Sequence, residues 1–373
     1  MSRPFVSFDD SQDAEMSLFN VISKIKENSK KLVPSLIVFT ASSDEFSNVA
    51  SRFNKEFPDS LSIGMSSYVN FSSEGYSLKA VSAIALYEDI ECVGGVIDEI
   101  IAFPKKYVDD IRNRVGELGV LENTICLEFT TAFSNCEDLV QDTFREALAV
   151  FGIPTAGGSA GCVLGSRESY VALNGVVYSE ACVYALIHNK KGAIHMFKEN
   201  MFKPIDHFYM ATDVDCDDRL VYEFDHMSAA QAVSQALGVS IDELPEQIKM
   251  HPVGRVEGDE ILITDVDEVL PSGAISYFAR IFNLSRLVQL EAEDIDLVWD
   301  LTARNVHNTM KNISFSLAVN CFSRSQYFIG QNRFGDFNHQ LTKEYGEFIG
   351  FSGYGEQMNY EHLNQTLVLV CFE

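Results

Sequence analysis

The stretch ICLEFTTAFSNCEDLVQDTFREALAVFGIPTAGGS, residues 125–159, contains the pattern that decides the fold. A short apolar strand is expected from Ile125 to Thr130, and apolar residues then recur at the spacing of one helix face. Gly152 and Pro154 mark the end of that helix, because glycine favours the helix terminus and proline cannot continue it. The stretch closes on Gly157-Gly158-Ser159. It therefore predicts a strand, a helix and a second strand.

Two other stretches follow the same plan. Leu36 to Thr40 leads to Gly64-Met65-Ser66, and Phe315 to Cys321 leads to Gly350-Phe351-Ser352. Each copy also has an S-x-x-E/Q pattern before its helix, which is typical of a capping box; the pairs are Ser42/Glu45, Ser134/Glu137 and Ser323/Gln326. The Gly-x-Ser turn follows the capping serine by 22, 23 or 27 residues. We therefore predict that residues 35–90, 123–188 and 313–372 are related units whose turns occupy equivalent positions and meet at one site.

Composition excludes several classes of partner. The chain has 373 residues, which suits two domains, and its formal net charge of −26 argues against binding to nucleic acid or to anionic membranes. The eight cysteines form no C-x-x-C pair, so buried thiols in a reducing compartment are expected. No segment is apolar for long enough to span a membrane. We expect a soluble, cytoplasmic protein.

The expected architecture is mixed α/β, with flanking helices around sheets built from the repeated units. Residues 1–32 form an N-terminal helix and lead-in, residues 33–190 a first half, and residues 191–373 a second half. The basic turn from His188 to Gly192 marks the boundary between the halves. Asn174-Gly175, between two apolar runs, predicts a tight hairpin.

One motif raises the question of hydrolysis. Residues 157–161 match the G-x-S-x-G nucleophile elbow, which works when a strand–turn–helix exposes the serine oxygen. Here a hairpin follows the motif, and no Asp–His partner order is apparent for Ser159. We expect no enzymatic activity, although a hydrolase that uses Ser159 or Cys321 as its nucleophile stays as an alternative.

The richest cluster of functional side chains lies near the C-terminus. It combines a cation, a carboxylate, a phenol and an amide, which together suit a small ligand with carboxylate and amine groups. With the turns, the candidate ligand-binding residues are Ser66, Gly157, Gly158, Ser159, Cys321, Arg324, Ser352, Tyr354, Glu356 and Asn364. The alternative is an internal pair of Arg324 and Glu356 that stabilises the third unit. No histidine pair has the spacing of a metal site, so no metal is expected.

These motifs resemble those of the FIST family, a sensory domain with paired N- and C-terminal portions. The resemblance covers residues 33–372 and rests on four segments: residues 63–66, 156–161, 251–254 and the ending 350–366. It implies a cytoplasmic sensor of small molecules such as amino acids. It also implies a separate signalling partner, such as a histidine kinase of a two-component system or a chemoreceptor.

Some members of the family resemble haem-binding nitric-oxide sensors that control a histidine kinase. The resemblance therefore leaves haem open as a cofactor, although a single axial histidine has no sequence signature. His226, His251 and His362 are the candidate ligands. An absorbance spectrum of the purified protein distinguishes this alternative from the amino-acid sensor.

Overall fold

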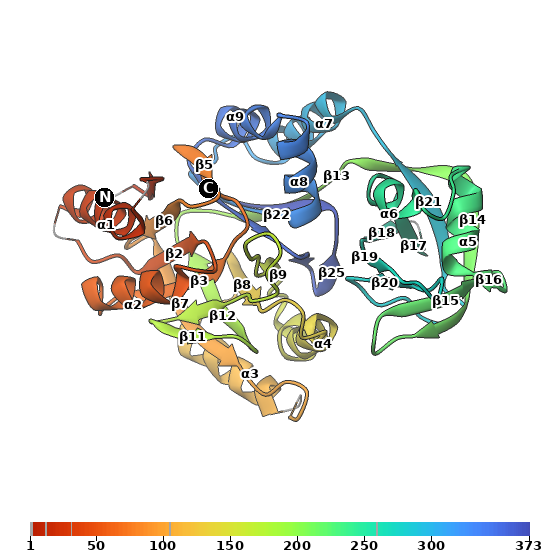
Figure 1. Ribbon diagram of the computed structural model, residues 1–373. Coiled ribbons are helices and arrows are strands. Elements are labelled where there is room, and N and C mark those ends of the chain that lie inside the picture. Colours follow the sequence, from red (N-terminus) through yellow and green to blue (C-terminus); the bar gives the residue numbers. More distant parts are fainter. Residues whose placement is uncertain (1–2, 12, 31, 104–105, 259) are drawn as a thin grey trace. The chain divides into compact units, whose positions relative to one another are not determined.

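The computed structural model describes residues 3–11, 13–30, 32–103, 106–258 and 260–373, and Figure 1 shows its helices and strands. Part of the expected lead-in, residues 1–2, 12 and 31, lies outside the described residues. The chain forms two compact units. Unit 1 comprises residues 1–198, 303–361 and 367–373, and unit 2 comprises residues 199–302 and 362–366.

Unit 1 is built from a repeated series of elements. In repeat 1 these are β1 (Phe5–Asp9), α1 (Ala14–Ser29), β2 (Leu36–Ala41), α2 (Phe46–Glu56), β3 (Leu61–Ser66), the hairpin β4 (Asn70–Ser72) and β5 (Gly75–Ser77), and β6 (Val81–Leu86). The order is therefore an outer strand and helix, then a strand–helix–strand unit, a hairpin and a final strand.

Repeat 2 has the same order: β7 (Ile90–Ile97), α3 (Lys106–Leu118), β8 (Thr124–Thr130), α4 (Glu137–Leu148), β9 (Thr155–Ser159), β10 (Val171–Leu173), β11 (Val176–Tyr178) and β12 (Cys182–Asn189). Repeat 3 contains β13 (Ile194–Asn200), α7 (Ile295–Thr309), β22 (Phe315–Cys321), α8 (Phe322–Gly330), α9 (Phe334–Tyr345), β23 (Phe348–Gly353), β24 (Glu356–Met358), β25 (Glu361–Leu363) and β26 (Thr366–Phe372). Most of unit 2 is inserted between β13 and α7, and the boundaries between the units fall within β13, α7, β25 and β26.

The central strands confirm that the three Gly-x-Ser segments are equivalent. β2 pairs with β3, β8 with β9 and β22 with β23, each time in parallel. In each pair the serine lies opposite the same position of the first strand; the matched residues are Ala41 and Ser66, Thr130 and Ser159, and Asn320 and Ser352. The units predicted from the sequence are therefore true structural repeats.

The hairpin of each repeat pairs with the sheet of another repeat. The three six-stranded sheets in the described part of unit 1 have the orders β1-β6-β2-β3-β10-β11, β7-β12-β8-β9-β24-β25 and β13-β26-β22-β23-β4-β5. The hairpin of repeat 2 thus extends the sheet of repeat 1, that of repeat 3 extends repeat 2, and that of repeat 1 extends repeat 3. Asn174 and Gly175, at the tip of β10–β11, both have positive φ, as the predicted tight turn requires.

The capping boxes were predicted wrongly. Neither α2 nor α4 has a side-chain cap, because each helix begins later than predicted and the N-cap residues are Glu45 and Cys136. The backbone N–H of Glu45 instead donates to the Ser42 carbonyl at 3.1 Å. In repeat 3, α8 begins one residue before Ser323, so that serine lies inside the helix.

Buried apolar faces attach the helices to the sheets. The sheet side of α1 carries Leu18, Val21 and Ile25, which pack with Phe39 of β2 and Phe53 of α2. A corresponding cluster joins α3 and α4 to β8 and β12. Because the central strands β2, β6, β8, β22 and β26 are buried on both faces, their sequences are mostly apolar rather than alternating.

Unit 2 contains an antiparallel sheet of its own. Its strand order is β18-β17-β21-β14-β15-β20-β19, with β16 (Met227–Ser228) paired to β15. The strands are β14 (Phe202–Asp215), β15 (Leu220–Phe224), β17 (Val253–Glu257), β18 (Glu260–Thr264), β19 (Val266–Val269), β20 (Ile275–Tyr277) and β21 (Arg286–Ala292), and the α-helices are α5 (Ala229–Leu237) and α6 (Leu244–Gln247). Ser228 caps α5 by accepting from the N–H of Gln231, and Gly238 ends that helix.

Candidate functional site

The three Gly-x-Ser segments meet in the interior of unit 1, but they are the ends of β3, β9 and β23 and not the predicted turns. The residue two places after each serine donates its backbone N–H to the serine carbonyl of another repeat. Gly161 donates to Ser66 at 2.8 Å, Tyr68 to Ser352 at 2.9 Å, and Tyr354 to Ser159 at 3.0 Å. These bonds form a closed ring through the three repeats, which we call the junction.

Glycine is required at the junction because backbone approaches backbone. A Cβ atom at Gly157 would lie 1.7 Å from the Glu128 carbonyl oxygen. A Cβ atom at Gly161 would lie 2.1 Å from the Ser352 carbonyl oxygen. No side chain fits at such distances, so these glycines allow the strands to come together.

The serine side chains of the junction are fully buried and have protein partners. The Ser66 hydroxyl donates to the Gly161 carbonyl at 2.6 Å, and the Ser352 hydroxyl donates to the Ser325 hydroxyl at 2.6 Å. The Ser159 hydroxyl accepts from the amide nitrogen of Gln357 at 3.0 Å. Ser159 is the last residue of β9, and a helix does not follow it, so the nucleophile-elbow geometry is not formed.

The predicted C-terminal cluster also lies mostly in the interior. Arg324 on α8 is fully buried; its Nε donates to Asn320 at 3.0 Å, and its guanidinium lies 5.4 Å from the Phe328 ring centroid. Tyr354 stacks on Phe322 at 4.6 Å. Glu356 on β24 is fully buried and pairs in register with Gly158.

The two remaining members of the cluster fall in different units. Cys321 ends β22 in unit 1 and is buried, whereas Asn364 belongs to unit 2. Within unit 2, the Asn364 side-chain oxygen accepts from the backbone N–H of Asp265 at 3.2 Å. Ligand contact by this cluster and by the serines stays a prediction.

A buried carboxyl that the motifs did not predict lies beside the junction. Glu128 of β8 is fully buried, and its oxygens accept from Gln141 at 2.5 Å and from Thr130 at 3.3 Å. Burial raises the pKa of Glu128 to about 7, outweighing the bonds from Gln141, Cys182 and Thr130, and the charge of Glu137 raises it further. The only sequence signal was an acidic residue inside an otherwise apolar strand.

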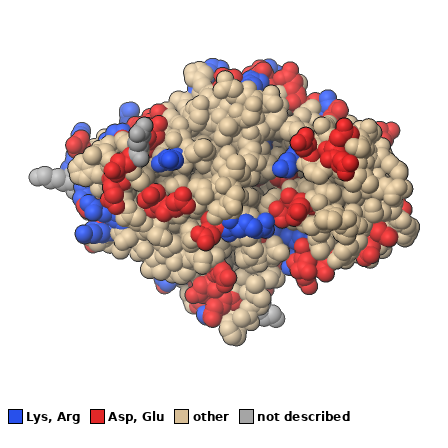
Figure 2. Space-filling model, viewed as in Figure 1, with Lys and Arg blue, Asp and Glu red and all other residues tan. Residues whose placement is uncertain are grey.

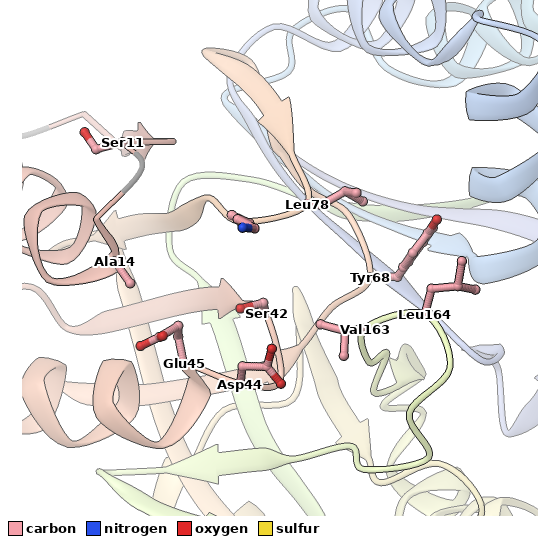
Figure 3. Close-up of a pocket in the computed structure, with 10 residues that line it drawn as sticks. Ser11, Ala14, Ser42, Asp44, Glu45, Tyr68, Leu78, Val163 and Leu164 are labelled. Atoms are coloured by element: carbon pink, nitrogen blue, oxygen red, sulfur yellow. The ribbon is translucent and has the colours of Figure 1, made fainter.

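A cavity of about 450 Å³ opens in repeat 1, next to the junction. Three regions line it: residue 11 before α1 with residue 14 at the start of α1, residues 42, 44 and 45 between β2 and α2, and residues 78 and 79 just before β6. Tyr68, Val163 and Leu164, which follow the Gly-x-Ser segments, complete the wall. Figure 3 shows Ser42, Asp44, Glu45, Leu78 and Tyr68 around it. We call this space the repeat-1 cavity.

The charged side chains of the repeat-1 cavity are available to a ligand. Within the described part of the chain, no hydrogen bond or ion pair engages the side chains of Asp44, Glu45 or Lys79. Leu78 and Leu164 are exposed and, with the Tyr68 ring, supply an apolar wall. The cavity therefore offers two carboxylates, one ammonium group and an apolar surface.

The three candidate haem ligands have polar or exposed surroundings. The side chain of His226 is 85% exposed on a turn of positive φ. The Nδ1 of His251 bonds to the Gln247 carbonyl at 3.0 Å, and the Nε2 of His362 lies 3.5 Å from the Asn364 amide nitrogen. None of the three lines the repeat-1 cavity, whereas haem needs an apolar pocket around its axial ligand.

The fold and the cavity define a mixed α/β protein assembled from three repeats with an inserted unit. The FIST N domain matches residues 35–227, and the FIST C domain matches residues 229–359. The chain therefore belongs to the FIST family, whose domains are associated with sensory signal transduction.

Matches beyond the FIST family models are few or distant. No curated protein matches the chain. One solved structure, described as "Cyanuric acid hydrolase: evolutionary innovation by structural concatenation", is similar over 100% of this chain and 99% of its own, at 9% identity and a TM-score of 0.34. In the described residues, no helix combines the length and the apolar character needed to cross a membrane. Figure 2 shows acidic side chains in several separate clusters on one face, in keeping with the net charge of −26.

Proposed function

We propose that this chain is a small-molecule sensor whose ligand binds in the repeat-1 cavity. The observation that carries the proposal is the set of three unpartnered charged side chains, Asp44, Glu45 and Lys79, beside an apolar wall. Charged groups around a cavity of this size are typical of sites that orient a polar ligand. The volume of about 450 Å³ lies within the range of small-molecule sites.

The charges favour an amino-acid-type ligand. An ammonium group of the ligand is attracted by Asp44 and Glu45, and its carboxylate by Lys79. Leu78 and Leu164 then face its apolar side chain. A ligand of only one charge leaves part of this set unpaired, which lowers its affinity relative to a zwitterion.

Tyr68 connects the cavity to the rest of unit 1. Its ring lines the cavity and packs on Phe322 at 4.7 Å, and Phe322 in turn stacks on Tyr354 at 4.6 Å. Its backbone N–H belongs to the junction. We infer that ligand binding reaches the predicted site residues of the junction and of the C-terminal cluster through this tyrosine. The output then passes to a separate cytoplasmic partner, such as a histidine kinase or a chemoreceptor.

The test is a binding screen of the twenty amino acids by thermal shift, followed by calorimetry on those that raise the melting temperature. Lys79→Glu should weaken the best ligand by about ten- to a hundredfold, because it removes a charged contact and adds repulsion. Lys55→Glu is the matched control, since Lys55 is exposed on α2 and does not line the cavity. Unchanged affinity in Lys79→Glu, or binding by no amino acid at millimolar concentration, overturns the proposal.

Two alternatives are checked on the same preparation. A Soret band after reconstitution with haem, removed by one substitution among His226, His251 and His362, favours the gas-sensor function. Ester turnover that is lost in Ser159→Ala or in a Cys321 variant favours the hydrolase. The geometry of the histidines and of Ser159 described above gives neither alternative a supporting observation.

A further inference from the structure

Repeat 2 contains a second cavity at the position equivalent to the repeat-1 cavity. Its volume is about 350 Å³. The same three connections line it: residues 98–102 between β7 and α3, Ser134 and Cys136 between β8 and α4, and residues 180–181 just before β12. The recurrence shows that the repeat itself forms the space. We call it the repeat-2 cavity.

The charge at one matched position is reversed between the two cavities. Lys79 lies two residues before the first residue of β6, and Glu180 lies two residues before the first residue of β12. Because β6 and β12 pair with equivalent strands of their repeats, the two residues occupy the same place. The repeat-1 cavity therefore has a cation where the repeat-2 cavity has a carboxylate.

The lining of the repeat-2 cavity contains carboxylates and no basic side chain among the described residues. Asp98 accepts from the Tyr107 hydroxyl at 2.6 Å, and Glu99 lies 3.6 Å from exposed Lys106. The side chain of Glu180 has no hydrogen bond or ion pair within the described chain. Ile100 and Ile101 add an apolar wall beside these acids.

We propose that the repeat-2 cavity binds an organic cation with an alkyl portion and no carboxylate, such as an alkylammonium or a diamine. The ammonium group pairs with Glu180, and the alkyl chain lies against Ile100 and Ile101. A zwitterion is disfavoured, because its carboxylate meets Glu180 where the repeat-1 cavity presents Lys79. The site is separate from the one assigned above and is tested without any amino acid present.

The experiment is calorimetric titration of the full chain with 1,4-diaminobutane, butylammonium and, as the anionic counterpart, butyrate. Glu180→Gln should weaken both amines at least tenfold, and Glu180→Lys should abolish their binding. Glu27→Gln is the matched control, since Glu27 is exposed on α1, outside both cavities, and the control removes the same charge. Lys79→Glu should leave amine binding to the repeat-2 cavity unchanged.

Three results overturn the proposal: no amine binds at millimolar concentration, Glu180→Gln binds amines as well as the wild type, or Glu27→Gln weakens them equally. The last result means that the amines respond only to the net charge of −26. Because Glu180 is exposed, its substitution should leave the fold intact, which a melting curve of each variant verifies. Failure here leaves the amino-acid screen untouched, since that screen depends on Lys79.

Discussion

Glu128→Gln tests whether the interior of repeat 2 holds a protonated carboxyl. Burial raises the pKa of Glu128 from its ordinary value near 4.5 to about 7 in the folded chain. Between these two values the folded state keeps the proton, whereas the unfolded state has lost it. The free energy of unfolding therefore falls as pH rises from about 4.5 to about 7, and it levels off above. Glutamine has no proton to lose.

The size of this pH-dependent change in the free energy of unfolding follows from the size of the pKa change. A rise from 4.5 to about 7 corresponds to about 3 kcal/mol, at 1.36 kcal/mol for each pKa unit. Because part of this change falls outside the window, the free energy of unfolding of Glu128→Gln should rise by about 2.5 kcal/mol relative to the wild type between pH 5 and pH 8. The difference in the free energy of unfolding between variant and wild type at pH 5 mainly reflects a separate cost. This is the cost of replacing the carboxyl that accepts from Gln141 and Thr130.

Urea unfolding of both proteins at a series of pH values measures this difference. Other acidic groups contribute equally to wild type and variant, so they cancel in the comparison. Glu27→Gln serves as the control, because an exposed carboxylate should give no pH-dependent difference. A Glu128→Gln offset that stays constant from pH 5 to pH 8 refutes the reasoning, since the carboxyl is then ionised in the folded state throughout.

Three further substitutions test the fold. Gly157→Ala should destabilise by about 3 kcal/mol or more, because its Cβ would lie 1.7 Å from a backbone oxygen, and a melting temperature equal to that of the wild type would contradict the junction geometry. Gly175→Ala should cost about 1–2 kcal/mol at the φ of +78° in the hairpin tip, as urea unfolding can measure. Arg324→Ala should lower stability by about 2–3 kcal/mol, given its burial and its bond to Asn320. If Arg324→Ala instead keeps its melting temperature and loses ligand affinity, Arg324 is a ligand residue as the sequence suggested.

Features that depend on residues close in sequence were predictable. The strand–helix–strand units follow from apolar runs and from Gly-x-Ser segments that come after each helix, and the registers of the three parallel strand pairs confirm the equivalence. Asn174-Gly175 fixes a hairpin because both residues tolerate positive φ. The capping boxes were predicted wrongly for a local reason: α2 and α4 begin after Glu45 and Cys136, later than the serines predict, and the residue types do not show this delay.

The cavities could not be predicted, because no single segment forms either of them. Each is assembled from three connections that lie far apart in the chain, such as Ser11, Asp44 and Lys79 in repeat 1. The pattern around Ser42 and Glu45 predicts a helix cap instead of a cavity wall. Their side chains are free for a ligand because the helix begins beyond them and leaves them in the connection.

The backbone bonds of the junction explain how the same fold can form two cavities with different linings. The ring of backbone bonds through Ser66, Ser159 and Ser352 holds the three repeats together. It uses backbone N–H and carbonyl groups and no side chain that lines a cavity. Residues such as Lys79 and Glu180 lie outside that ring, at the ends of strands whose pairing does not depend on their charge. The repeats can therefore differ in the ligands they attract while the junction stays the same, and a change of specificity in one cavity needs no compensation in the core.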